Sequence, residues 1–340
     1  MGAITKSAWK LRKSVAHPGA GNTITYEIDK GGFLEDLMII ARGSVNVTGG
    51  TTNGTATGDF NPQAMVNMFE VIAVSAGVYP DGTLKRVYPE TVHTRYMFDT
   101  RDELPDYLGA TIAGTGSTAV YTPYVLRFAL PKNPEPNETS LWTGGYTGLQ
   151  LIITCGHGTD MYNGNDRNWD FSGVTFDIYD RRNQGSPNST EVAVLYEQDI
   201  IIPINGANTS WNLRDYLQQK YGYLDILALF QTTNHVLTDG ILQQIVNIED
   251  ANQTPFFYTV NPPALKFRQF PEIGKTFAAA AGLYRIPLAE DFMLSNLIQS
   301  PAITLNVSNP GGANVDRIIL SCRRVAMPAV DAKSGAVSFS

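Results

Sequence analysis

The residues best suited to nucleophilic chemistry lie at positions 155–160, which read CGHGTD. His157 and Asp160 could pair as a base and its orienting carboxylate, and Cys155 stands just before them. An exposed nucleophile, however, needs a sharp turn such as G-x-S-x-G, which the sequence lacks. Cys155 instead ends the strand-like run LIITC, and Cys322 lies within the similar run IILSCRR. We therefore expect both cysteines to be buried thiols, and we predict no catalytic residue.

Oxygen ligands for a metal gather in the loop DMYNGNDRNWD at 160–170. Asp160, Asn163, Asp166 and Asp170 surround a glycine at short spacing, a pattern that suits Ca²⁺. The loop lacks the bidentate Glu that the EF-hand requires at its twelfth position, so we interpret it as a surface turn and keep these four residues as weak metal candidates. The histidines lack the spacing of zinc sites; they are His17, His93, His157 and His235.

The first 20 residues are basic and predict an amphipathic helical arm. Apolar residues recur at helical spacing on one face, namely Ile4, Ala8, Leu11 and Val15. Lys6, Lys10 and Lys13 share another face, and Pro18 follows as a breaker. Together with the indole of Trp9, these cations are what an interfacial helix presents to lipid headgroups. The membrane-facing candidates are therefore Lys6, Trp9, Lys10 and Lys13, with a mobile tail or packing on a neighbouring subunit as alternatives.

The composition disfavours nucleic-acid binding. Only 17% of the 340 residues are charged and the net charge is −7; without the four positive residues of the first 13, the rest carries −11 (−7 − 4). Such an acidic body is unsuited to coating nucleic acid. No apolar run reaches 18 residues, and the start lacks the apolar region of a signal peptide. The Gly-rich stretch at 49–58 lacks the Lys-Ser/Thr ending of a phosphate loop, so we predict no cofactor.

From residue 22 the hydrophobic period becomes two, which predicts antiparallel strands. The expected strands of the first series cover 24–28, 33–48, 65–77, 121–131, 148–156 and 174–182. A Pro/Asn/Ser-rich linker follows at 183–190. The expected strands of the second series cover 193–204, 223–233, 241–250, 281–292, 302–308 and 315–325. Each series contains one helical stretch, at 89–104 and at 262–274.

The two series repeat the same order of segment types. FLEDLMII at 33–40 resembles YLDILALF at 223–230, and YDRR at 179–182 resembles LSCRR at 320–324. The other matching segments, in order, are 71–74 with 245–248, the helices beginning at Pro89 and Pro262, 127–131 with 284–288, and 148–154 with 302–308. We therefore predict a duplicated β-sandwich. Its expected core includes Leu37, Ile39, Val71, Phe128, Leu151, Ile153, Phe176, Leu227, Leu229, Ile286, Leu305 and Ile319.

With its basic arm, two strand series, matching helices and linker, the sequence resembles the double jelly-roll major capsid proteins of the tectivirus, corticovirus and adenovirus lineage. The stretches TITYEIDKGGFLEDLMIIARGSVNV and AGLYRIPLAEDFMLSN carry the resemblance most strongly. It implies an all-β fold of two tandem eight-stranded antiparallel jelly-roll sandwiches with short helices in loops. The expected parts are an arm at 1–20, a first roll at 21–182, the linker at 183–190, a second roll at 191–328 and a largely irregular tail at 329–340.

The resemblance also implies a function, that of a non-enzymatic building block of an icosahedral virion. Three chains with two rolls each would place six similar rolls around one axis, and such a pseudo-hexameric homotrimer can tile a shell. The implied partners are neighbouring capsomers, penton and minor capsid proteins and, through the arm, the internal membrane of a bacterial virus. Specific nucleic-acid binding is not expected, and assembly is expected in the host cytoplasm.

Two other functions fit the same sandwiches. A carbohydrate- or receptor-binding spike protein would use aromatic platforms, for which the candidates are Trp142 with Tyr146 and Tyr162 with Trp169. A two-jelly-roll glycan hydrolase would need two carboxylates about 5–10 Å apart in a cleft. The sequence alone does not place its candidate carboxylates in such a cleft; these are Glu27, Glu35, Glu191 and Glu197.

Overall fold

The computed structural model describes residues 8–48, 68–76, 82–100, 116–129, 140–157, 168–183, 194–204, 208–213, 216–217, 221–232, 242–249, 255–256, 282–288, 298–299, 302–308, 315–326, 328–330 and 337–339. The chain forms two compact units. Unit 1 comprises Met1–Pro131, Glu135–Val192 and Asn234–Val236, and unit 2 comprises Lys132–Pro134, Ala193–Thr233 and Leu237–Ser340.

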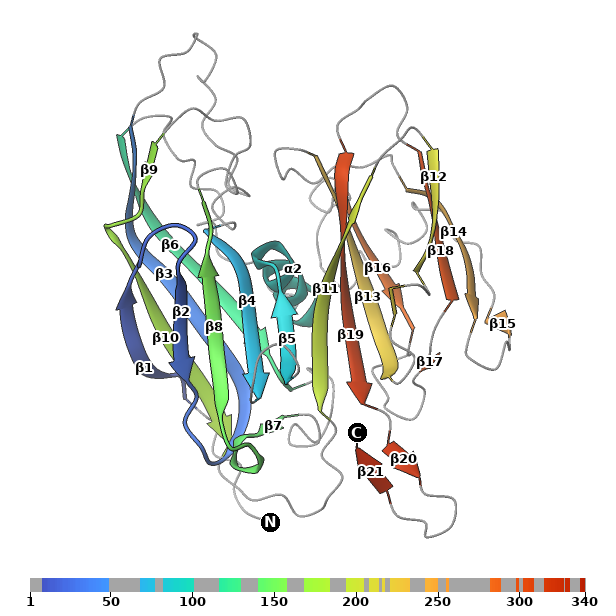
Figure 1. Ribbon diagram of the computed structural model, residues 1–340, viewed down its shortest axis with the longest axis horizontal. Coiled ribbons are helices and arrows are strands. Elements are labelled where there is room, and N and C mark those ends of the chain that lie inside the picture. The colour runs from blue at the N-terminus through green and yellow to red at the C-terminus, as the bar shows by residue number, and fades with distance from the viewer. Residues whose placement is uncertain are drawn as a thin grey trace. The chain divides into compact units, whose positions relative to one another are not determined.

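Unit 1 is a sandwich of two antiparallel layers (Figure 1). The first layer has the order β1 (Lys10–Ala16), β10 (Val174–Asn183), β3 (Phe33–Thr48) and β6 (Gly116–Arg127), and the short strands β7 (Leu141–Trp142) and β9 (Asn168–Asp170) also pair with β3. The second layer has the order β2 (Thr23–Glu27), β8 (Leu149–Cys155), β4 (Phe69–Ala76) and β5 (Thr83–Val87). Helix α2 (Pro89–Thr100) contacts β6 and β4, and a short 3₁₀ turn covers Thr143–Gly145.

Unit 2 has two corresponding layers. The first has the order β11 (Leu195–Pro203), β19 (Val315–Ala326), β13 (Tyr221–Thr232) and β16 (Leu283–Pro287), with the short β17 (Ile298–Gln299) also on β13. The second has the order β12 (Asn208–Asn212), β18 (Ala302–Ser308), β14 (Leu242–Glu249) and β15 (Pro255–Phe256). Near the end of the chain, β20 (Pro328–Val330) pairs with β21 (Val337–Phe339).

The two units share one topology. When the principal strands of each unit are numbered in chain order, without the short β7, β9 and β17, both units read 1-8-3-6 in one layer and 2-7-4-5 in the other. The matched strand segments of the two series lie on equivalent strands, from β3 with β13 to β10 with β19, except that only Arg127 of the segment 127–131 belongs to β6. The predicted duplication is therefore confirmed for the strands, while the expected helix at 262–274 lies outside the described residues.

Even an irregularity of the third strand is duplicated. The pairing register shifts at Glu35 in β3 and at Leu224 in β13, so that each strand bulges by one residue. The carbonyl of the bulged residue accepts an N–H from just beyond the sixth strand, from Phe128 at 2.7 Å in unit 1 and from Leu288 at 2.9 Å in unit 2. The bulge therefore fixes where the sixth strand ends in both units.

Each core lies between the layers of its own unit. In unit 1, the ring of Phe69 on β4 lies 4.8 Å from that of Phe176 on β10, measured between centroids. In unit 2, Leu305 of β18 packs in one cluster with Phe230 of β13. All of the predicted core residues are buried except Val71, which is half-buried.

The predicted helical arm is wrong where the structure describes it, because Lys10–Ala16 is the strand β1; Lys6 lies outside the described residues. An isolated helix of this length is unstable in water. As a strand, the segment pairs with β10 from Lys10 opposite Asp180 to Ala16 opposite Thr175. The expected irregular tail is wrong for the residues that form β20 and β21.

Candidate interaction surface of unit 1

The residues expected to face a membrane lie at the edge of a sheet. Lys10 and Lys13 are exposed on β1, the outermost strand of its layer. Trp9 precedes the strand and remains 39% exposed, and the guanidinium carbon of Arg181 lies 5.4 Å from the centroid of its ring. This cation–π contact directs the indole against β10. The described helix α2 is too short and too polar to cross a bilayer.

The weak metal candidates are not brought together in the described part of the chain. Asp160, Asn163 and Asp166 lie outside it. Asp170 is exposed on β9, and its Oδ1 accepts a hydrogen bond from the backbone N–H of Ser172 at 2.8 Å. This hydrogen bond lowers the pKa of the Asp170 carboxyl. Among the residues that the structure describes, no group of three or more His, Cys, Asp and Glu side chains could hold a metal ion.

The cysteines are buried, as predicted. Cys155 on β8 and Cys322 on β19 are both free thiols. Burial raises the pKa of Cys155 to about 12, which keeps the thiol protonated and weakly nucleophilic. His157 is exposed beside the corner at Gly21, and its sequence partner Asp160 lies outside the described residues.

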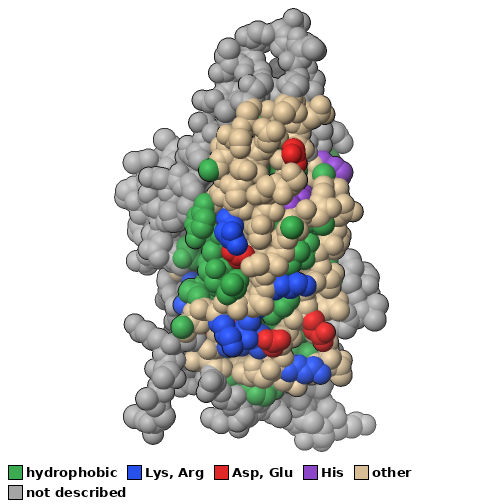
Figure 2. Space-filling view, turned by 90° about the vertical axis from the view of Figure 1, so that its left-hand side faces the viewer, with side chains coloured by type: hydrophobic (Ala, Val, Ile, Leu, Met, Phe, Trp, Pro, Cys, Tyr) green, Lys and Arg blue, Asp and Glu red, His purple; other side chains and the backbone are tan. Residues whose placement is uncertain are grey.

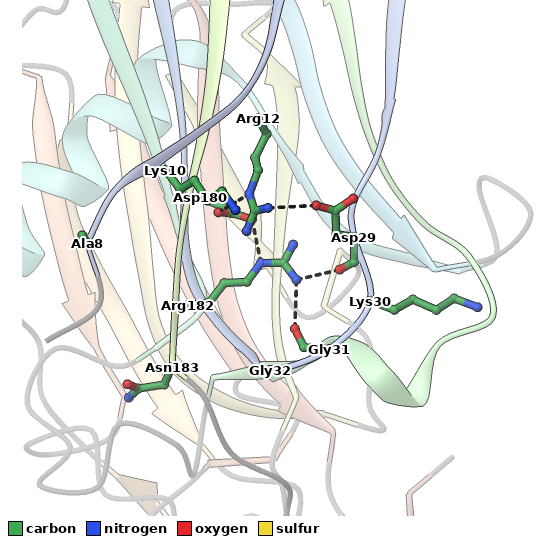
Figure 3. A pocket seen from close by; sticks show the side chains of 10 residues that line it. All are labelled: Ala8, Lys10, Arg12, Asp29, Lys30, Gly31, Gly32, Asp180, Arg182 and Asn183. Carbon is green, nitrogen blue, oxygen red and sulfur yellow. Dashed lines mark hydrogen bonds and ion pairs between the residues drawn. The ribbon is translucent and has the colours of Figure 1, made fainter. Parts of the chain in front are cut away.

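A polar pocket of about 470 Å³ lies at the start of β1 (Figure 3). Its floor is an ion-pair network in which Asp180 of β10 accepts hydrogen bonds from Arg12 Nε at 2.7 Å and from Arg182 Nε at 2.6 Å. The second carboxylate, Asp29, accepts from Arg12 Nη1 at 3.0 Å. The full lining comprises Ala8, Lys10, Arg12, Asp29, Lys30, Gly31, Gly32, Asp180, Arg182 and Asn183.

Two local features of the backbone build this pocket. The pairing of β1 with β10 shifts between Leu11 and Lys13, which makes Arg12 the bulged residue and turns its side chain toward Asp180. The bend before β3 requires glycine at position 32, where φ is +77° and a Cβ would lie 2.8 Å from the carbonyl oxygen of Asn183. Sequence analysis singled out only Lys10 of the lining, because the members of this site come from three distant segments.

The pocket lining is electropositive. Four cations, from Lys10, Arg12, Lys30 and Arg182, face two carboxylates. Burial lowers the pKa of the Arg12 guanidinium, but the hydrogen bond and charge of Asp180 outweigh this effect and leave the pKa above its ordinary value. The Arg12 guanidinium therefore stays charged, and the lining is suited to an anion.

The outer face of the first layer of unit 1 combines apolar side chains with paired charges. Leu11 is 48% exposed and Tyr121 is 54% exposed. Between them, Asp177 accepts hydrogen bonds from Arg42 Nε and from Ser14 Oγ. The hydrogen bond from Arg42 lowers the pKa of Asp177. Figure 2, on the side where β1 lies in Figure 1, shows hydrophobic side chains gathered beside Lys and Arg. Such a face suits packing against another surface.

Among the described residues of the two rival functions, Trp142, Glu35 and Glu197 pack or pair within the fold, whereas Glu27 is exposed at the end of β2. Trp142, a candidate sugar platform, is half-buried and packs on Phe33 with ring centroids 5.1 Å apart. The candidate carboxylates Glu35 and Glu197 form ion pairs with Arg181 at 3.2 Å and with Arg323 at 2.9 Å, respectively. Tyr162 and Glu191 lie outside the described residues. Both arginines therefore bind carboxylates of their own unit.

Comparison with known proteins supports the topology. No family model and no curated protein matches the sequence. The crystal structure of the STIV MCP, from Sulfolobus Turreted Icosahedral Virus, matches 98% of this chain and 100% of its own, with a TM-score of 0.68 at 13% identity. The chain has the double jelly-roll fold. Two further double jelly rolls are similar. The major capsid protein P2 from bacteriophage PM2 has a TM-score of 0.58 at 11% identity, covering 97% and 99% of the two chains. PBCV-1 VP54 has a TM-score of 0.61 at 14% identity, covering 100% and 99%.

Proposed function

We propose that this double jelly roll is a structural subunit of a virus shell, a major capsid protein. The observation that carries the proposal is the presence of two rolls of one strand order in a single chain, which matches the STIV MCP over 98% of this chain and 100% of that one. This role requires no cofactor, because a shell protein acts through its shape and its contacts with other subunits. The outer face of unit 1, where exposed apolar side chains lie beside paired charges, offers surface for such contact.

The assembly we propose is a homotrimer. Three copies of a chain with two like rolls place six similar sandwiches around a threefold axis, so that the capsomer has a nearly sixfold outline. Capsomers of that outline pack edge to edge into an icosahedral shell in the virion. The low charged fraction of 17% fits the charge-poor centres of obligate interfaces.

Further partners follow from the same proposal. Neighbouring capsomers, penton proteins and minor capsid proteins would complete the shell, with assembly in the host cytoplasm. An internal membrane would meet the chain near β1, where Lys10 and Lys13 are exposed. If it does, a Lys10→Glu/Lys13→Glu variant should still form trimers but should no longer float with anionic liposomes. Unchanged flotation would remove the membrane from the proposal.

The test of the shell role is the mass of the purified protein. Light scattering at micromolar concentration should give three times the 37.2 kDa of the chain, and concentrated samples should yield closed shells or hexagonal arrays in electron micrographs. A stable monomer that neither trimerises nor forms arrays would contradict the proposal. A monomer that binds members of a glycan array would favour the receptor-binding alternative instead.

A further inference from the structure

We infer that the pocket at the start of β1 binds a phosphate group, carried either by a small soluble anion or by a lipid headgroup. The inference does not rest on the shell role, because it concerns the chemistry of one cavity within unit 1. Its residues are Lys10 and Arg12 from β1, Lys30 and Gly31 from the bend before β3, and Arg182 from β10.

The first argument is an unused donor. Arg182 directs Nε to Asp180 and donates through Nη1 to the carbonyl oxygens of Asp29 at 2.6 Å and Gly31 at 3.0 Å. Its Nη2 is buried and has no hydrogen-bond partner among the described residues. Leaving a buried guanidinium N–H without an acceptor costs free energy. An anion in the pocket would supply that acceptor.

The second argument is the excess of positive charge. Asp180 and Asp29 already accept from Arg12, so the ammonium groups of Lys10 and Lys30 are surplus to the ion pairs. In Figure 3 the Lys10 side chain points toward Asp180, whereas Lys30 extends outward at the rim. Both lysines are exposed and their flexible stems allow the ammonium groups to reach a bound anion. The lining carries a net charge of +2, from four cations and two carboxylates, whereas the whole chain carries −7.

The third argument is size and direction. A cavity of about 470 Å³ is larger than a single carboxylate needs, and its donors come from β1, from the bend and from β10. A planar carboxylate takes donors on its two oxygens, as Asp180 does here from Arg12 and Arg182, whereas a tetrahedral phosphate accepts donors from several sides. On the bend, nothing lies within 4 Å of the place a Cβ of Gly31 would take. The ligand can therefore approach the backbone there.

Titration with inorganic phosphate tests the site, followed by ³¹P line broadening or calorimetry near neutral pH. We expect saturable binding that Lys10→Gln/Lys30→Gln weakens by at least about tenfold, since a lost ion contact of roughly 1.4 kcal/mol is tenfold in affinity. Arg12 and Arg182 are left intact because they hold the fold. The matched control is Arg42→Gln, which removes one charge from an exposed side chain outside the pocket and should leave phosphate affinity unchanged.

Vesicles of phosphatidylcholine, with and without phosphatidic acid, separate the two sources of phosphate. Flotation that needs phosphatidic acid and is lost in Lys10→Gln/Lys30→Gln assigns the site to a headgroup, and phosphate binding without flotation assigns it to a soluble anion. The inference is overturned if neither probe binds, or if Arg42→Gln weakens binding as much as the lysine variant. It is also overturned if the lysine variant only lowers the oligomer mass, because the pocket would then take a carboxylate from a neighbouring copy.

Discussion

The third strands of the two units occupy the same place in the same topology, yet they meet different surroundings. In β13 every residue from Tyr221 to Gln231 is buried, on both faces of the sheet. In β3 the core-facing residues Leu37 and Ile39 are buried, while Met38 on the outer face is half-buried and Arg42 is exposed. Strand order and bulge are therefore common to the two rolls, whereas the outer face is free to differ. Unit 1 presents its outer face to a partner or to solvent.

The difference extends to the ion pair beside the bulge. Asp36 of β3 and Asp225 of β13 are equivalent, because each lies opposite the first arginine of the Arg-Arg pair on the eighth strand. Burial raises the pKa of Asp36, although Arg127 and Arg181 oppose this effect. In unit 2, Arg285 donates its Nε to Asp225 at 2.9 Å, and both side chains are buried. Removing one partner of a buried ion pair strongly destabilises a protein, because the other charge stays buried without it. Such a substitution is therefore a sensitive test of how the two units differ.

The largest expected effect is that of Arg285→Met. Removing the guanidinium leaves the buried Asp225 carboxylate without this partner. We therefore expect the free energy of unfolding to fall by about 3 kcal/mol. Urea unfolding followed by fluorescence measures the change. The control is Arg42→Met in unit 1, which removes an exposed partner of Asp177 but leaves the hydrogen bond from Ser14, and it should lower the midpoint much less than Arg285→Met does. Equal losses in the two variants would mean that the outer faces do not differ as described.

A packing pair gives the next largest effect. Leu227 on β13 and Met38 on β3 are equivalent, since they lie opposite Ser321 and Tyr179, two residues beyond the paired aspartates. Leu227→Ala should lower the free energy of unfolding by about 3 kcal/mol, because it leaves a cavity in a fully buried site. Met38→Ala should cost about 1 kcal/mol, because its site is only half-buried. A larger loss for Met38→Ala than for Leu227→Ala in urea unfolding would contradict the described difference in burial between the two strands.

The last prediction, the smallest when counted per histidine and per pH unit, is a dependence on pH that belongs to unit 1. Burial lowers the pKa of His17 to about 4 and of His93 to about 3, from the ordinary 6.5. Below pH 6.5 the unfolded chain takes up these protons before the folded chain does. The contribution of the two buried neutral histidines to the free energy of unfolding is therefore complete above pH 6.5. As the pH falls toward their pKa values in the folded protein, this contribution decreases by up to about 1.4 kcal/mol per pH unit for each histidine.

Unfolding by urea on both sides of pH 6.5 measures this slope. His17→Phe and His93→Phe should each flatten this slope, whatever they do to absolute stability. The described residues of unit 2 contain no histidine, so probes placed there should lack this component. A slope that persists in the double His17→Phe/His93→Phe variant would refute the assignment.

The sequence predicted the strands that are long and apolar. FLEDLMII and YLDILALF carry enough periodicity to reveal β3 and β13, and their common order with later segments revealed the duplication. The missed strands are short and polar, such as KLRKSVA in β1, TLKRV in β5 and NTSWN in β12. These segments become strands through pairing with a neighbour. In β1 the pattern of Leu11 and Val15 satisfied a helical period that tertiary pairing overrode.

The pocket could not be predicted from the sequence for a related reason. Arg12 faces Asp180 only because β1 bulges against β10, and residues 12 and 180 are far apart along the chain. Sequence analysis singled out Lys10 as a membrane-facing cation of a helical arm, and it did not identify the neighbours of Lys10 in space. A pattern along one segment predicts the face of that segment, whereas a site assembled from a bend and two strands requires the register of the sheet.

The central claim is that two like sandwiches in one chain let three copies imitate a sixfold ring. Negative-stain electron microscopy of the purified protein tests this most directly, through averages viewed down the symmetry axis. The account predicts a particle of three chains with six lobes of similar density and a hexagonal outline. Averages with two lobes, a ring of some other order, or three lobes without internal division would contradict it.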